Sequence, residues 1–409
     1  MTNTQQRRVL SNAIMLYGMT AAKIVLPLLT LPYLTRVLSK DCYGVVAYVK
    51  SIMCFAQVLI DFGFMLSATK DIALAGKGKN RVNAILGDVL AARLMLSALA
   101  AVGMFVVAVS IPMLRPHLLF TMLNFAVVFL TVFLFDFFFR GIEEMSVITS
   151  RYVLMRSISV ALTFLFVKSD ADMLMLPVLE IAGSLAAIVF VMHEIHRRGY
   201  ACAFTGLSAA WQKLRSSAIY FVSNAATTTF NALTTLLIGI YLPLEQVADW
   251  SICIQMVMVV QMFYSPVADS LYPHMVKRRD VVFSLKLIAV FFAIVVSGCI
   301  FTWFSAEFFL ELVGGMKYVS AAPLLRAFIP LLLFSFLAIM FGWPMLGTIG
   351  GEKETTLSTV SAGGAQVLGM VILLKAGAFG VMALALLRGG VELLLFAMRG
   401  CMFLRLLVH

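Results

Sequence analysis

The chain has 409 residues, of which 62% are hydrophobic and only 12% are charged, with a mean hydropathy of +1.00. An average soluble domain carries about 25% charged residues, so this composition excludes a water-soluble globular protein. The formal net charge is +11, but most basic residues lie in short loops between apolar segments, a distribution that does not indicate a nucleic-acid partner.

The apolar segments predict an all-α polytopic membrane protein with 12 transmembrane helices, because about 20 apolar residues are needed to cross the hydrocarbon core. The first apolar segment is too long for the apolar region of a cleavable signal, so we expect it to remain as a helix. The predicted spans are residues 13–35, 44–66, 86–110, 118–139, 152–168, 172–192, 217–241, 250–272, 284–304, 323–346, 356–375 and 378–398.

The longest connection between predicted spans is basic and central, and it divides the chain into two halves. We therefore expect an N-terminal six-helix lobe at 1–192, a cytoplasmic linker at 193–216 and a C-terminal six-helix lobe at 217–409. A weak repeat supports this division, since Ala13-Ile14 and Ala218-Ile219 begin equivalent helices. Parallel repeats are common in transporters, where the substrate site lies between or within the halves.

The distribution of basic residues predicts the orientation in the membrane. With the N-terminus inside, the cytoplasmic loops hold 19 of the 31 lysines and arginines, and the outer loops hold 6. Cytoplasmic loops of membrane proteins carry the excess of basic residues. We therefore expect both termini and the 193–216 linker to face the cytoplasm.

Four cations lie inside apolar stretches of the first half, and none has an acid one helical turn away: Lys23, Lys50, Arg93 and Arg156. A charged side chain in a bilayer costs about 2.5–3.5 kcal/mol on insertion scales and usually faces a cavity or a partner. At a rise of about 1.5 Å per residue, Arg156 and Arg93 are expected nearest the inner boundary, Lys23 near the midplane and Lys50 nearer the outer boundary. With Arg36 at the outer mouth, these cations predict an unpaired ladder across the membrane that binds an anionic substrate. The alternative is that each side chain snorkels to the nearer interface.

Acidic residues inside the spans suggest further roles. Glu180 and Asp61 are candidates for a charge partner of the cations or for a site that binds a coupling ion, H⁺ or Na⁺. Two structural ion pairs are predicted from spacing of one helical turn: Arg388 with Glu392, and Asp136 with Arg140. No metal site, catalytic residue or cofactor is expected, because the sequence has no metal-ligand spacing and no phosphate-binding glycine loop.

Several segments carry a family resemblance: residues 31–44 (LPYLTRVLSKDCYG), 60–64 (IDFGF), 67–73 (SATKDIA), 139–145 (FRGIEEM) and 271–273 (LYP). They resemble the Wzx-type O-antigen flippases, in the polysaccharide transport branch of the multidrug/oligosaccharidyl-lipid/polysaccharide exporter superfamily. Ser39-Lys40 departs from this pattern, as does Arg140, whose role the resemblance leaves open.

The resemblance implies two six-helix lobes in a V shape, in a multi-pass protein of the bacterial inner membrane. It implies a flippase that moves undecaprenyl-pyrophosphate-linked O-antigen or capsule repeat units to the outer leaflet by alternating access. Membrane lipid and other polysaccharide assembly proteins are the expected partners, and the cations would meet the pyrophosphate. Two alternatives remain open at this point: a repeat-unit polymerase, and a cation-coupled drug antiporter of the same superfamily.

Overall fold

The computed structural model describes residues 22, 25–27, 29–76 and 78–408 of the chain, and its regular elements there are all helical. Ten helical stretches in these ranges are long and apolar enough to cross a membrane. Shorter apolar helices occur at Val25–Val37 and Ala232–Tyr241, where the first and seventh spans are predicted. The chain is therefore an all-α polytopic membrane protein, and twelve spans are consistent with it.

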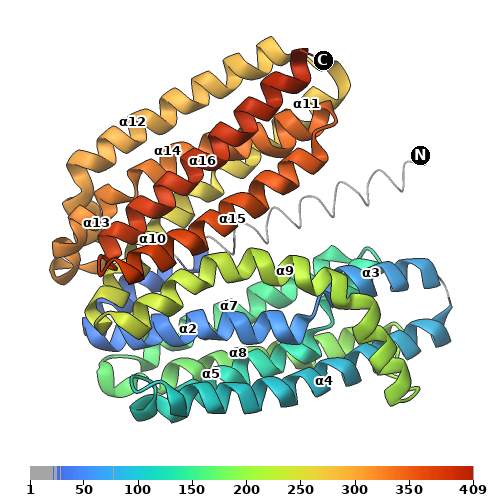
Figure 1. Ribbon diagram of the computed structural model, residues 1–409. Helices are drawn as coiled ribbons and strands as arrows, with labels where there is room; N and C mark the ends of the chain where they lie inside the picture. Colours follow the sequence, from blue (N-terminus) through green and yellow to red (C-terminus); the bar gives the residue numbers. More distant parts are fainter. Residues whose placement is uncertain (1–21, 23–24, 28, 77, 409) are drawn as a thin grey trace. The chain divides into compact units, whose positions relative to one another are not determined.

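The contacts divide the chain into two compact units between Leu236 and Leu237, within α9. The first unit contains the elements before this point (Figure 1). Its helices are α2 Lys40–Asp61, α3 Phe64–Ala75, α4 Lys79–Ser110, α5 Leu118–Leu130, α6 Asp136–Gly141, α7 Met145–Phe166, α8 Met175–Arg197 and the larger part of α9 Leu207–Tyr241, with short 3₁₀ turns at η1 Arg115–His117, η2 Thr131–Leu134 and η3 Asp170–Asp172.

Two helix breaks in the first unit shape the interior around α4. Between α2 and α3, Phe62 and Gly63 have φ of 39° and 76°, and between η2 and α6, Phe135 has φ of 47°. Non-glycine residues seldom adopt this left-handed conformation, so the surrounding packing must hold the two phenylalanines in place. Phe135 is fully buried, and α2, α4 and α5 all contact one another.

The connection between α8 and α9 is shorter than the predicted linker, because α8 extends to Arg197 and α9 begins at Leu207. The connecting segment lies along the first turns of α4. The side-chain oxygen of Asn83 accepts a hydrogen bond from the backbone N–H of Ala201 at 3.0 Å. The carboxylate of Asp88 accepts a hydrogen bond from the Thr205 hydroxyl at 2.8 Å. The division into lobes at 193–216 stays a prediction.

The second unit contains the remaining elements. They are α10 Leu244–Met262, α11 Tyr264–Arg278, α12 Val281–Gly314, η4 Met316–Ala321, α13 Ala322–Ala327, α14 Ile329–Met340, η5 Phe341–Leu346, η6 Gly347–Ile349, α15 Glu352–Lys375 and α16 Val381–Val408. Within this unit α14 packs against both α12 and α16 (Figure 1).

The helix that begins with α14 is broken where it reaches η5, a π-helical segment. Pro344 lies inside this segment, and Gly342 leaves helical geometry with ψ of −121°. Proline removes a backbone donor and commonly disrupts a helix, which explains the break. The buried Arg399 of α16 packs against Gly342 and donates to the carbonyl of Ala338, so a cation completes the hydrogen bonding near the break.

Candidate functional site

The centre of the candidate site is one carboxylate that two cations share. Glu180 on α8 accepts from Lys50 Nζ on α2 at 2.9 Å and from Arg156 Nη1 on α7 at 3.3 Å, both through Oε1. The Lys50 and Arg156 side chains are 44% and 38% exposed, whereas that of Glu180 is 18% exposed. The cluster has an excess of one positive charge, and its cations are the more accessible members.

The depth of this cluster corrects the predicted ladder. Lys50 and Arg156 contact the same carboxylate, so they lie at one level rather than near opposite faces of the membrane. The prediction failed because α7 begins at Met145, ahead of the predicted start at residue 152. With a rise of about 1.5 Å per residue, Lys50 lies about 15 Å from the start of α2 and Arg156 about 15 Å from the end of α7.

The prediction that these cations are unpaired is also wrong for Lys50, Arg93 and Arg156. Their partners come from other helices, which spacing within one helix cannot reveal. Glu180 and Asp61 therefore act as charge partners. Lys23 lies outside the described residues, and Arg36 lies exposed near the end of the Val25–Val37 helix. Substrate binding by these residues stays a prediction.

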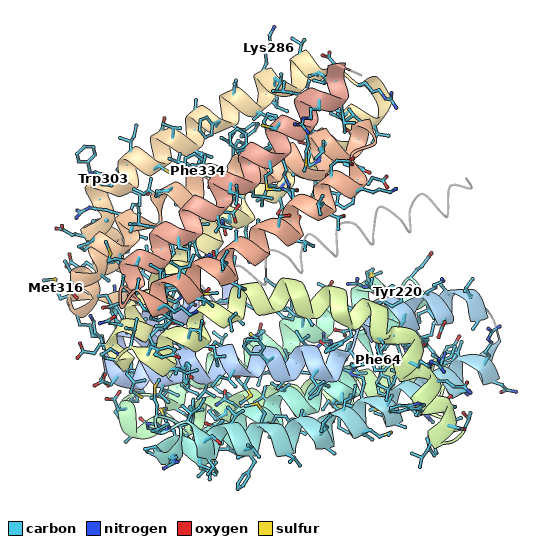
Figure 2. The ribbon with its side chains drawn as sticks, viewed as in Figure 1. Phe64, Tyr220, Lys286, Trp303, Met316 and Phe334 are labelled. Atoms are coloured by element: carbon cyan, nitrogen blue, oxygen red, sulfur yellow. The ribbon has the colours of Figure 1, made fainter. Side chains whose placement is uncertain are left out.

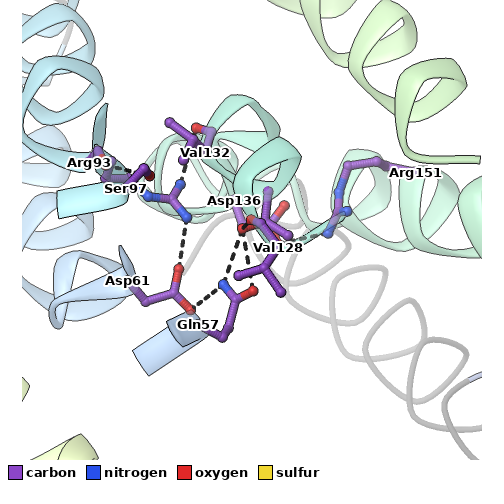
Figure 3. Close-up of polar contacts among 9 residues, drawn as sticks. Gln57, Asp61, Arg93, Ser97, Val128, Val132, Asp136 and Arg151 are labelled. Carbon is purple, nitrogen blue, oxygen red and sulfur yellow. Dashed lines mark hydrogen bonds and ion pairs between the residues drawn. The ribbon is translucent and has the colours of Figure 1, made fainter. Parts of the chain in front are cut away.

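Arg93 on α4 is the buried member of a second network at the two helix breaks (Figure 3). It pairs with Asp61 Oδ1 at 2.7 Å and donates to the carbonyl of Val132 in η2 at 3.2 Å. Gln57 donates to Asp61 Oδ2 at 2.9 Å and to the Thr131 hydroxyl at 3.1 Å. These contacts join α2, α4 and η2, so Arg93 helps to hold these three elements together.

The two predicted structural ion pairs have different outcomes. Asp136 pairs with Arg151 at 2.7 Å and not with Arg140, although the charge of Arg140 also acts on it. Asp136 is the first residue of α6, directly after the break at Phe135, whereas Arg151 lies on α7. Glu392 lies one helical turn from Arg388, close enough for their charges to act on each other, and their ion pair stays a prediction.

Sequence reasoning missed Gln57, Thr131, Arg151 and Arg399 as members of polar networks. Gln57 lies one helical turn before Asp61, a spacing that offered a signal. The predicted spans 152–168 and 378–398 leave Arg151 and Arg399 just outside them in cytoplasmic loops, yet both residues are buried in helices. Their helices extend beyond the apolar windows from which spans are recognised.

Comparison with known proteins identifies the family. The family model described as "Polysaccharide biosynthesis protein" matches residues 9–279. The chain belongs to this family. Two bacterial relatives bear the provisional name of O-antigen transporter. The protein of Escherichia coli K12 is 21% identical over 88% of this chain and 89% of its own length, and that of Shigella dysenteriae is 23% identical over 68% and 69%.

Solved structures show the same fold at low sequence identity. An inward-facing multidrug resistance transporter of the MATE family, in the MOP superfamily, has a TM-score of 0.74 and 13% identity, and the match covers 97% of both chains. The lipid II flippase MurJ in an inward closed conformation has a TM-score of 0.72 and 12% identity over 98% of this chain and 90% of its own. The chain therefore has the exporter fold that both share.

Proposed function

We propose that this protein is a flippase that moves an undecaprenyl-pyrophosphate-linked oligosaccharide, an O-antigen or capsule repeat unit, from the cytoplasmic to the outer leaflet. The observation that carries the proposal is the pair of accessible cations, Lys50 and Arg156, at one level of the first unit. The chain is a membrane transporter rather than an enzyme, in agreement with its family and relatives. This disfavours the polymerase alternative.

The chemistry of the cluster suits a pyrophosphate that must bind and then leave. Arginine offers a planar fork to phosphate oxygens and lysine a compact charge. When the site is empty, Glu180 neutralises part of this charge and limits the cost of holding two cations inside the membrane. When a pyrophosphate arrives, Lys50 and Arg156 turn from Glu180 toward it, and Glu180 competes again during release.

The net positive charge of the cluster argues against export of cationic drugs. A cationic substrate would meet two cations and one carboxylate that both of them already contact. We extend the proposal to an inner-membrane location with both termini in the cytoplasm and to alternating access coupled to H⁺ or Na⁺. Other polysaccharide assembly proteins are proposed partners.

Translocation of an extracted lipid-linked repeat unit in proteoliposomes tests the proposal. The wild-type protein should move the unit across the bilayer, and Lys50→Ala and Arg156→Ala should each reduce the rate. Lys286→Ala is the matched control, because Lys286 is an exposed lysine on α12, far along the chain from the cluster (Figure 2). Absence of translocation by folded wild-type protein, or equal rates for all three variants, would refute the proposal.

A further inference from the structure

The second unit contains a cavity of about 510 Å³ whose chemistry differs from that of the Lys50 cluster. Its lining combines Ser265, Asp269 and Tyr272 of α11 with Trp343 of η5 and Arg399 of α16. The α11 residues lie three or four positions apart, so they share one face of that helix. The volume is within the range of about 300–1,000 Å³ found for small-molecule sites.

Two exposed aromatic rings give the cavity apolar surfaces. Trp343 is 53% exposed and Tyr272 is 43% exposed, although both line a concave site. The break in the helix at Gly342 and Pro344 places Trp343 on the π-helical segment. A side chain at Gly342 would collide with the guanidinium of Arg399, with its Cβ 2.7 Å from Nη1, so this glycine allows the arginine to reach the lining.

The polar groups of the lining include both donors and acceptors. Asp269 is exposed and offers acceptor oxygens, whereas Ser265 and Tyr272 offer hydroxyls. Arg399 is buried, and its guanidinium already donates to Ala338, to Ser358 at 3.2 Å and to Thr359 at 2.9 Å. The opposite charges of Asp269 and Arg399 leave the described lining without net charge.

These features distinguish among classes of ligand. A phosphate needs donors and positive charge, but here the accessible charge is a carboxylate and the arginine is committed to protein acceptors. An organic cation would be attracted by a carboxylate and aromatic faces, but the fixed positive charge of Arg399 in the same lining opposes it. A sugar carries hydroxyls that both donate and accept, and its ring has apolar C–H faces that can lie on aromatic rings. The lining of this cavity matches the sugar.

We propose that the cavity between α11, η5 and α16 binds a sugar ring of the transported oligosaccharide, with Trp343 as the stacking platform and Asp269 as a hydroxyl acceptor. This inference rests on the proposed function, which supplies a substrate with both a pyrophosphate and sugars. Asp269, Trp343 and Arg399 lie toward the span ends that the proposed orientation places in the cytoplasm. The cavity would therefore recognise the sugars as the substrate is loaded.

The test compares two lipids on the full-length protein in nanodiscs. One is undecaprenyl pyrophosphate, and the other is the lipid-linked repeat unit extracted from the strain that carries the protein. Wild-type protein should bind the repeat unit more tightly. Trp343→Ala should reduce this preference about three- to tenfold, the equivalent of one aromatic contact, and leave the affinity for undecaprenyl pyrophosphate unchanged. Asp269→Asn should also reduce the preference.

Matched variants separate a sugar contact from a general effect. Trp303 on α12 is 52% exposed and is not part of this lining, so Trp303→Ala should keep the preference (Figure 2). Trp343→Phe retains an aromatic face and should keep most of the preference for the repeat unit, which controls for misfolding. Lys50→Ala should weaken the binding of both lipids equally, because it acts on the shared pyrophosphate.

The possible outcomes distinguish the two proposals. If wild-type protein binds both lipids equally, or if Trp343→Ala weakens both equally, the sugar site is refuted while the flippase proposal stands. If neither lipid binds, the proposed function fails and this inference falls with it. Saturable binding of tetraphenylphosphonium that Asp269→Asn abolishes, with the sugar preference intact, would make the cavity a cation site and overturn the inference.

Discussion

Replacing Glu180 by glutamine should tighten the binding of an anionic lipid and slow its export. The variant keeps the shape of the side chain but removes the negative charge that Lys50 and Arg156 share. A phosphate charge about 8 Å from the carboxylate is repelled by about 2 kcal/mol at an effective dielectric constant of about 20, which corresponds to about 30-fold in affinity. Water near the part-exposed cations screens some of this repulsion, so we expect about tenfold.

The assay measures the binding of undecaprenyl pyrophosphate to protein in nanodiscs at one ionic strength, together with surface glycan in a flippase-deficient host. Export should fall because release becomes slower as affinity rises. Glu307→Gln is the control, because Glu307 pairs at 3.1 Å with Arg326 in the second unit and is 62% exposed. An affinity for undecaprenyl pyrophosphate that stays unchanged or weakens in folded Glu180→Gln would show that Glu180 does not compete with the substrate.

Three other substitutions test separate parts of the structure. Arg93→Ala should destabilise the protein by about 1–3 kcal/mol, because it removes a buried guanidinium and leaves the carbonyl of Val132 without that donor, and thermal unfolding in detergent should show a larger loss than for Arg156→Ala. Gly87→Ala should displace the connection after α8 and lower the temperature of thermal unfolding in detergent, since its Cβ would collide with Ala203. Gly103→Ala, with open space around it on the same helix, should leave that temperature unchanged. Lys23→Ala, at the cation that the sequence places nearest the midplane, should abolish surface glycan without loss of membrane protein, and normal glycan would contradict that role.

The spans were predictable because hydropathy is a property of consecutive residues. The ten stretches that the structure identifies coincide with predicted spans, although helices such as α4 and α7 extend beyond the apolar windows. Polar residues in the first turns of α7, among them Ser146 and Arg151, concealed its true start. That error of about two turns displaced the estimated depth of Arg156 and produced the ladder.

The pairing of the cations was not predictable, because ion pairs between helices depend on packing. Lys50 and Glu180 are 130 residues apart, and Arg93 and Asp61 are 32 apart. The helix breaks were equally hidden, since Phe62 and Phe135 are not residues that usually adopt positive φ. The cavity in the second unit depends on three separated segments meeting, so only its individual aromatic and charged residues were visible in the sequence.

The shared carboxylate also has a consequence for biogenesis. Lys50 is synthesised 130 residues before Glu180, which at about 5–20 residues per second is an interval of roughly 7–26 s. During that time α2 is in the translocation machinery or the bilayer with a cation whose acidic partner has not yet been made. The early helices therefore cannot reach their final packing one by one. A truncation before α8 should leave the nascent first unit dependent on the insertase or on chaperones. In the full chain, α8 supplies the acid that balances the charge of α2, a helix made long before it.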